Sequence, residues 1–233
     1  MPPAMDDDDG IDRLSRRSTL VRAGGIAAVA LGASSLASEA ADAGEHSALA
    51  CVLTPEMTEG PYYLDGDKVR RNITEGLPGA PLSLRLSVLD ASTCKPIKGA
   101  TVDIWHASAG GKYSGAESND TVGRTFLRGI QHTDAKGLAI FKTVYPGWYP
   151  GRAVHIHVKV HVGGDDVHTG QLFFRDSFTD AVYKRAPYKA RGERSMRNSD
   201  DSLYGSGGSR SLLALSTAGK GYAGAISMGV RRS

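Results

Sequence analysis

Several features that would place a chain in a common protein class are scarce or missing from this sequence. Its 233 residues contain no Gly-x-Ser-x-Gly element with a plausible histidine and aspartate, so the sequence does not indicate a serine hydrolase. No internal repeat and no long amphipathic helical pattern occur, which disfavours a helical bundle. The chain therefore has to be interpreted from its short segments.

The sequence also lacks a large excess of charge of either sign. Lys and Arg number 28 against 25 Asp and Glu, and the basic residues form only short pairs such as Arg70 and Arg71. Without a basic stripe interleaved with aromatic residues, nucleic-acid binding is not expected. Glycine, by contrast, is abundant at 29 residues, which favours a loop-rich β fold.

Long apolar runs are missing as well. The stretch from about 24 to 36 is too short and too rich in Gly and Ala for a transmembrane helix. It follows Arg16 and Arg17 and precedes small residues, which is the order of an export signal, and the arginine pair resembles a twin-arginine motif with Thr19 where an aromatic is usual. We expect residues 1–45 to be a signal and linker. The mature protein would then be periplasmic or extracellular, with no stable membrane insertion. A disordered basic terminus or an uncleaved anchor is the alternative.

Only two cysteines occur, Cys51 and Cys94, and both lie beyond the apolar stretch. In an exported chain an even pair most simply forms one disulfide, here between the start of the domain and an early turn. Two free buried thiols, or lipid attachment at Cys51, are the alternatives. The lipid site fits less well because Cys51 lies far beyond the apolar stretch.

Residues 46–233 are interpreted as one all-β domain. Alternating segments separated by Gly, Pro or Asp turns occupy 82–90, 100–107, 125–133, 138–145, 153–162 and 170–176. Short strands at this spacing are typical of an antiparallel β-sandwich or barrel, and we expect a sandwich with long loops. We also expect a helical turn within 177–188, a loop over 202–211 and a closing strand at 221–230.

The segment 153–162 combines two kinds of side chain. Because side chains in a strand alternate faces, one face is aliphatic and the other carries His155, His157, Lys159 and His161. Residues i and i+2 lie roughly 6.5–7 Å apart at Cα, so both imidazoles of the His-Ile-His pair can converge on one ion. A solvated face that happens to contain histidine is the alternative.

Two tyrosines lie in loops that could bring them to this histidine pair. Tyr149 is flanked by turn residues just ahead of the strand, and Tyr113 follows the glycines after the 100–107 segment. Phenolate oxygens with imidazole nitrogens suit ferric iron better than zinc or copper(I). Each tyrosine taken alone could also pack on the surface.

The segments TPEMTEGPYYLDG, VDIWHASAGGKYSG, FLRGIQHTDAKGLAIFKTVYPGWYPGRAVHIHVKV and GQLFFRD together resemble the intradiol ring-cleavage dioxygenases, in particular their small exported branch. The resemblance runs from about Cys51 to Phe174. It implies a non-haem Fe(III) enzyme that uses O2 to cleave a catechol-type ring between its two hydroxyl-bearing carbons, giving cis,cis-muconate-type diacids.

The resemblance also assigns roles. Tyr113, Tyr149, His155 and His157 match the four ferric ligands, and Tyr149 matches the one that leaves iron and takes a substrate proton. Arg152 matches the arginine that stabilises charge developing on the substrate, and Gln171 matches a glutamine near the site. A turn arginine and a strand-edge glutamine are the plainer interpretations. Tyr145 is the rival to Tyr149; the family tyrosine follows Pro-Gly-x and precedes Pro, which favours Tyr149.

The expected partners are a small aromatic diol and O2, and the protein is expected to be a monomer or homodimer. Catechol, hydroxyquinol, protocatechuate and larger lignin-derived catechols all require the same iron chemistry. The alternative function is a non-catalytic exported β-sandwich that binds another molecule, because a fold does not establish a function.

Overall fold

A computed structural model describes residues 52–66 and 68–232. The predicted export signal and Cys51 lie outside these residues, so the signal and the Cys51–Cys94 disulfide stay predictions. No helix among the described residues is long and apolar enough to cross a membrane.

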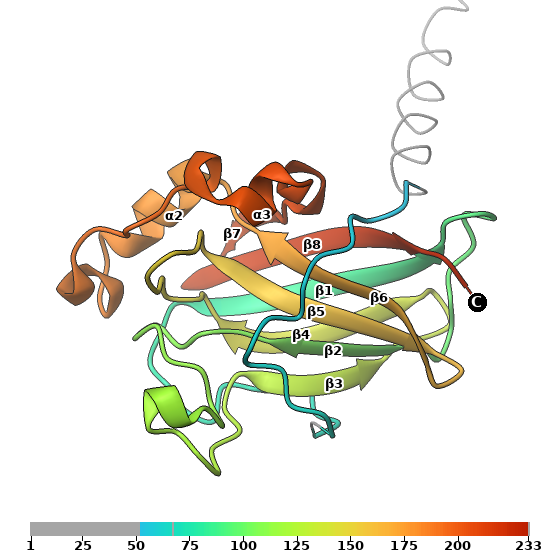
Figure 1. The fold of residues 1–233 in the computed structure, drawn as a ribbon, viewed down its shortest axis with the longest axis horizontal. Coiled ribbons are helices and arrows are strands. Elements are labelled where there is room, and N and C mark those ends of the chain that lie inside the picture. The colour runs from blue at the N-terminus through green and yellow to red at the C-terminus, as the bar shows by residue number, and fades with distance from the viewer. Residues whose placement is uncertain (1–51, 67, 233) are drawn as a thin grey trace, which may run out of the picture.

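The described chain folds into two four-stranded sheets packed face to face (Figure 1). One sheet has the order β4-β1-β8-β7 and the other β3-β2-β5-β6. The strands are β1 (Pro81–Asp90), β2 (Thr101–Trp105), β3 (Arg128–His132), β4 (Leu138–Val144), β5 (His155–Val162), β6 (Asp165–Phe173), β7 (Ala214–Ala218) and β8 (Gly221–Val230). The predicted all-β sandwich is thus confirmed.

The core forms where the aliphatic faces of the two sheets meet. Along β1 the alternating residues Leu84, Leu86 and Val88 are fully buried, while Arg85 points outward. From the opposite sheet, Ile156 and its aliphatic neighbours on β5 join the same cluster. Since the aliphatic face of β5 is used by the core, its histidine face must lie on the outer side of the sandwich.

The described chain also has two short α-helices, and Figure 1 shows α2 and α3 on the same side of the sandwich. The α-helices are α2 (Asp176–Tyr183) and α3 (Ser202–Gly205), and the 3₁₀ turns are η1 (Glu117–Asn119), η2 (Tyr188–Arg191), η3 (Asn198–Asp200) and η4 (Gly208–Ser211). The expected helical turn within 177–188 corresponds to α2. The expected loop over 202–211 was wrong, because Asp201 caps α3 by accepting hydrogen bonds from Leu203 N and Tyr204 N.

Two features of the first sheet differ from the purely antiparallel expectation. The closing strand at 221–230 is present, but β8 pairs with β1 in parallel, and only its other neighbour, β7, is antiparallel. The β7 strand was not predicted. Its residues are largely exposed, so it has little of the apolar alternation by which the other strands were found.

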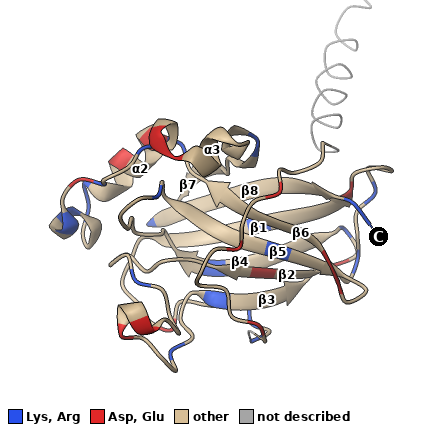
Figure 2. Cartoon of the chain, viewed as in Figure 1, with Lys and Arg blue, Asp and Glu red and all other residues tan. Residues whose placement is uncertain are grey.

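The segment 54–66 covers the outer face of the second sheet (Figure 1). Met57 N donates to Thr169 O at 2.8 Å, and Lys159 Nζ donates to Glu59 Oε2 at 2.6 Å. This covering segment turns the outward face of β5 into a buried surface, since both faces of His155–Val160 are buried. Basic and acidic residues are interspersed along the described chain, as Figure 2 shows.

Candidate metal centre

The two histidines of the His-Ile-His pair converge on the covered face of β5. His155 Nε2 and His157 Nε2 are 3.0 Å apart, and both side chains are almost fully buried. Register places His157 opposite Trp105 on β2 and Gln171 on β6, so the three side chains share one row across the sheet. The Trp105 ring stacks on the His157 ring with centroids 4.9 Å apart and planes 5° apart.

One hydrogen bond sets the proton position on His155. Its Nδ1 lies 2.7 Å from Ala153 O, and because a carbonyl only accepts, Nδ1 carries the proton. The lone pair of Nε2 is therefore free to bind an ion. Burial, reinforced by the charge of Arg152, lowers the pKa of His155 to about 3, so its imidazole is neutral at ordinary pH. Burial also lowers the pKa of His157 well below its usual value.

Both loop tyrosines lie beside the histidine pair. Tyr149 Oη is 3.1 Å from His155 Nε2, and the Tyr113 and Tyr149 rings lie with centroids 5.5 Å apart. The loop after β2 holds Tyr113 by its backbone: Tyr113 N donates to Asn119 Oδ1 at 2.5 Å, and Thr121 Oγ1 donates to Tyr113 O at 2.6 Å. Tyr113 is 1% exposed, whereas Tyr149 is only partly buried.

These side chains fit a metal ion such as the one that the resemblance implies. The buried Tyr113 hydroxyl makes no hydrogen bond of ordinary geometry within the described residues. Two donors that bind one ion at roughly 2.0–2.1 Å and at right angles lie about 3 Å apart, as His155 Nε2 and His157 Nε2 do. Two phenol oxygens with two imidazoles form a donor set suited to ferric iron.

Burial keeps both phenols protonated while no ion is bound. It raises the pKa of Tyr113 well above the ordinary tyrosine value, and the proximity of Tyr149 adds to this effect. Burial also raises the pKa of Tyr149. A cation bound to these oxygens would favour loss of the phenol protons, because metal ligands bind in their deprotonated form.

The structure brings Arg152 and Gln171 together next to this centre. Arg152 Nη2 donates to Gln171 Oε1 at 2.5 Å, and Arg152 Nε donates to Asp201 Oδ2 at 2.9 Å. Gln171 is buried and its Nε2 donates to Thr58 O at 2.9 Å, which links β6 to the covering segment. The plainer interpretations of a turn arginine and a strand-edge glutamine do not describe these contacts.

Comparison with known proteins matches this chain to a family. A family model described as Dioxygenase matches residues 54–184. A solved intradiol ring-cleavage dioxygenase of Tetranychus urticae is 36% identical with a TM-score of 0.74, and the match covers 78% of this chain and 95% of that one. The chain belongs to the intradiol ring-cleavage dioxygenase family.

Two further matches have lower sequence identity to this chain. The dioxygenase domain of a dioxygenase carbohydrate-binding protein fusion of the bacterium Streptomyces sp. SirexAA-E is 32% identical with a TM-score of 0.60, covering 78% of this chain and all of that one. Chlorocatechol 1,2-dioxygenase of Pseudomonas putida is 28% identical over an alignment of 137 residues, and the match covers 50% of this chain and 52% of that protein. The chain thus spans about half the length of the curated relatives it matches.

Tyr145, the rival to Tyr149, lies elsewhere in this intradiol dioxygenase. Its hydroxyl is 2.8 Å from Thr179 Oγ1, and its ring packs against Phe174 in the hydrophobic core. Tyr145 directly follows β4 and is buried in the core, whereas Tyr149, four residues further along the chain, is only partly buried. The structure therefore places only Tyr149 next to His155.

Three residues near the centre were not among the predicted site residues. Trp105 stacks on His157, Asp201 binds Arg152, and Tyr62 stacks on Tyr113 with ring centroids 4.3 Å apart. The DSLY sequence could have indicated a helix cap at Asp201, but no pattern could have placed that cap beside β5, because the contact joins residues 49 positions apart.

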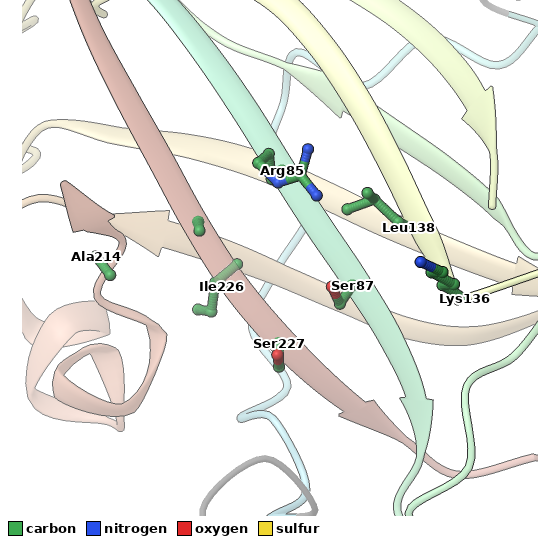
Figure 3. Close-up of a pocket in the computed structure, with 8 residues that line it drawn as sticks. Arg85, Ser87, Lys136, Leu138, Ala214, Ile226 and Ser227 are labelled. Atoms are coloured by element: carbon green, nitrogen blue, oxygen red, sulfur yellow. The ribbon is translucent and has the colours of Figure 1, made fainter. Parts of the chain in front are cut away.

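Outside this centre, the described residues include no cluster of three or more His, Cys, Asp and Glu side chains that could hold a metal. The centre contains only two residues of those types, and tyrosines supply its other donors. A hollow of about 410 Å³ lies on the other sheet, and it is lined by Arg85, Ser87, Lys136, Leu138, Ala214, Ala225, Ile226 and Ser227 (Figure 3). These residues offer neither imidazole nor phenol, so the hollow does not resemble an iron site.

Proposed function

We propose that this chain is a non-haem Fe(III) dioxygenase that uses O2 to cleave catechol-type rings between the two hydroxyl-bearing carbons, giving cis,cis-muconate-type diacids. The observation that carries the proposal is the convergence of three donor atoms. Tyr149 Oη and His157 Nε2 both lie within 3.1 Å of His155 Nε2, beside the buried phenol of Tyr113. A non-catalytic binding sandwich would have no need for buried donors of this kind.

In the proposed enzyme Tyr113, Tyr149, His155 and His157 would hold the ferric ion. When bound, that ion supplies Lewis acidity, which favours ionisation of both catechol hydroxyls and prepares the ring for reaction with O2. The neutral imidazoles supported by Ala153 O and Trp105 remain fixed donors throughout.

The two tyrosines are suited to different tasks. Tyr113 is fully buried and its backbone is held by Asn119 and Thr121, so it is suited to stay in place. Tyr149 is partly exposed in a loop between Pro146 and Gly151, so it can move aside for a substrate oxygen. As a free phenolate it would accept one substrate proton, consistent with a pKa that burial raises.

Arg152 would stabilise negative charge on the bound ring. Its side chain is 19% exposed, and Asp201 and Gln171 fix its Nε and Nη2. A guanidinium fixed before substrate arrives needs little reorganisation to stabilise charge in the transition state. The partly exposed Tyr149 and Arg152 would therefore face an anionic aromatic diol.

The substrate class follows from the chemistry and from the relatives. Proteins matching half of this chain or less are named chlorocatechol and catechol 1,2-dioxygenases, and the shared feature of those substrates is two adjacent ring hydroxyls. We propose a small aromatic diol together with O2 as the substrates of this chain. The partly buried Tyr62 would contact the ring substituents of the substrate, since it lies edge-on to Tyr149 with ring centroids 6.4 Å apart.

The test is substrate-dependent oxygen uptake by the iron-loaded protein. With catechol as substrate, we expect one O2 consumed per ring cleaved and a diacid product that retains all six carbons and contains both oxygen atoms of labelled O2. Absence of uptake with catechol, hydroxyquinol and protocatechuate by protein that contains iron would contradict the proposal.

We further propose export by the twin-arginine-type signal within residues 1–45 and a disulfide between Cys51 and Cys94, both on the sequence alone. Peptide mapping of the mature protein without reductant would show a linked Cys51–Cys94 peptide and a chain that begins beyond the signal. The protein is expected to be a monomer or homodimer, which sedimentation would distinguish.

A further inference from the structure

The carboxylate of Asp201 joins the C-terminal part of the chain to the loop ahead of β5. Asp201 is 3% exposed, and its Oδ2 accepts hydrogen bonds from Arg152 Nε at 2.9 Å and from Ala153 N at 2.8 Å. Its Oδ1 accepts from Leu203 N at 2.8 Å and Tyr204 N at 3.3 Å. Each oxygen thus receives two donors, and the arrangement depends on both oxygens being acceptors.

The residues that Asp201 binds lead directly to the metal centre. Ala153 O is the acceptor that fixes the His155 ring through Nδ1, so the same residue is held at its N–H by Asp201 and holds a ligand through its carbonyl. Arg152 continues from Asp201 to Gln171. One carboxylate therefore restrains both a histidine ligand and the cation beside it.

The contacts of Arg152 leave one nitrogen for a substrate. Nε is bound to Asp201 and Nη2 to Gln171, whereas Nη1 has no hydrogen-bond partner among the residues that the structure describes. Without Asp201 the guanidinium could rotate about its long side chain, and Nη1 would no longer point in one direction. A guanidinium held at two of its nitrogens loses little entropy when the third binds.

Asp201 is itself held from a different part of the fold. Asn198 Nδ2 donates to Phe174 O at 2.8 Å, and Asn198 N lies 3.3 Å from both carboxylate oxygens of Asp176. Arg194 bonds the same Asp176. These contacts anchor the segment 194–201 to the start of α2, independently of β5, so Asp201 acts from a fixed support.

We infer that Asp201 is a positioning residue of the active site, which aims Arg152 Nη1 at the substrate and orients His155 through Ala153. The inference rests on the proposed function for its catalytic consequence. It makes the segment 194–205 part of the site, although that segment contributes no iron ligand.

The test variant is Asp201→Asn, matched by Glu193→Gln at an exposed carboxylate outside the segment 194–205. Asparagine replaces one acceptor oxygen with a donor, so it must lose one pair of hydrogen bonds as well as the charge. We expect kcat/KM for catechol to fall about 10–100-fold in Asp201→Asn, as for other residues that orient metal ligands, and to stay unchanged in Glu193→Gln. Asp201→Glu, which keeps the charge, should lie between the wild type and Asp201→Asn.

A purely structural role is separated from positioning by a double-mutant cycle with Arg152→Lys. If Asp201 acts through Arg152, the loss caused by Asp201→Asn should be at least about threefold smaller in the Arg152→Lys background. Equal losses in both backgrounds would overturn the inference. Should Asp201→Asn fail to fold, the same cycle is run with Asp201→Glu.

A second measurement does not depend on activity. In the iron-free protein, amide hydrogen exchange of residues 150–155 should be faster in Asp201→Asn than in Glu193→Gln, while exchange in β1 stays the same. If the iron-containing wild type cleaves none of catechol, hydroxyquinol and protocatechuate, the proposed function fails, and this measurement alone decides the part played by Asp201. Unchanged protection of residues 150–155 would then overturn the inference.

Discussion

At the scale of single residues, burial determines the protonation of the candidate ligands. Low exposure raises the pKa of Tyr113 and lowers that of His155, so all four donors are neutral when no ion is bound. Neutral imidazoles are ready to bind a cation, whereas the phenols must lose protons first. Loading the centre should therefore release protons, and affinity for iron should rise with pH.

Tyr113→Phe tests the role of the buried phenol. The variant keeps the ring that stacks on Tyr62 and loses only the donor oxygen. We expect activity on catechol to fall at least about 100-fold, because removing a ligand should exceed the 10–100-fold typical of its supporting residues. Tyr145→Phe is the control: it loses a buried hydrogen bond to Thr179, worth about 1 kcal/mol of stability, and should keep its activity. Equal activities of the two variants would remove Tyr113 from the site.

The stability of the iron-free protein should depend on pH through His155. Its pKa is about 3 in the folded state against 6.5 as the ordinary value, so between these values the unfolded chain binds more protons. The free energy of unfolding should therefore rise with pH across this window, by up to about 1.4 kcal/mol per pH unit for this histidine, and become flat above it.

Urea unfolding between pH 4 and 7 measures this slope. Carboxylates with lowered pKa values add a slope of the same sign, so the informative quantity is the difference between the wild type and His155→Gln. His132→Gln, at the exposed end of β3, serves as control. A His155→Gln variant with the same slope as the wild type would show that His155 is not held neutral by the fold.

At the scale of elements, the two tyrosine loops are packed against each other at Gly147. Gly147 N donates to Ser108 O at 3.0 Å, and a Cβ on Gly147 would lie 2.4 Å from Ala109 O. Only glycine allows this approach. The contact ties the Tyr149 loop to the loop that carries Tyr113, so the distance between the two phenols depends on it.

Gly147→Ala should separate the loops. We expect a loss of roughly 1–3 kcal/mol of stability from overpacking, together with weaker iron binding, because the alanine methyl meets backbone that cannot rotate away. Gly151→Ala in the same loop is the control: its φ of +84° strains an alanine by about 1–2 kcal/mol, but nothing lies within 4 Å of the added methyl. Iron content after dialysis distinguishes them, and equal iron content in both variants would contradict the packing argument.

The sequence predicted those elements whose signal is local. The period-two alternation on β1 and β5 placed the core face and brought His155 and His157 together, and the order of motifs indicated Tyr113 and Tyr149. It could not predict β7, whose exposed residues lack alternation, or the parallel pairing of β8 with β1, which depends on distant contacts. Asp201 was missed for the same reason, since its role comes from a partner 49 residues away.

At the scale of the whole molecule, the sandwich brings four distant segments to one face. The covering segment 54–66, the Tyr113 loop, the Tyr149 loop with β5, and the segment around Asp201 meet over the outer side of the β3-β2-β5-β6 sheet. The aliphatic side of that sheet is fixed by the core. A rigid sheet beneath and several loops above are a common way to build a precise site that can still admit a substrate.

The central claim is that two phenols and two imidazoles of this chain bind ferric iron. The most direct test is the visible absorption spectrum of the aerobically purified protein, measured together with its iron content. We predict about one iron per chain and a red to burgundy charge-transfer band from phenolate bound to Fe(III), which shifts when catechol is added without oxygen. Iron-replete protein that stays colourless would show that Tyr113 and Tyr149 are not ligands and would contradict the dioxygenase proposal.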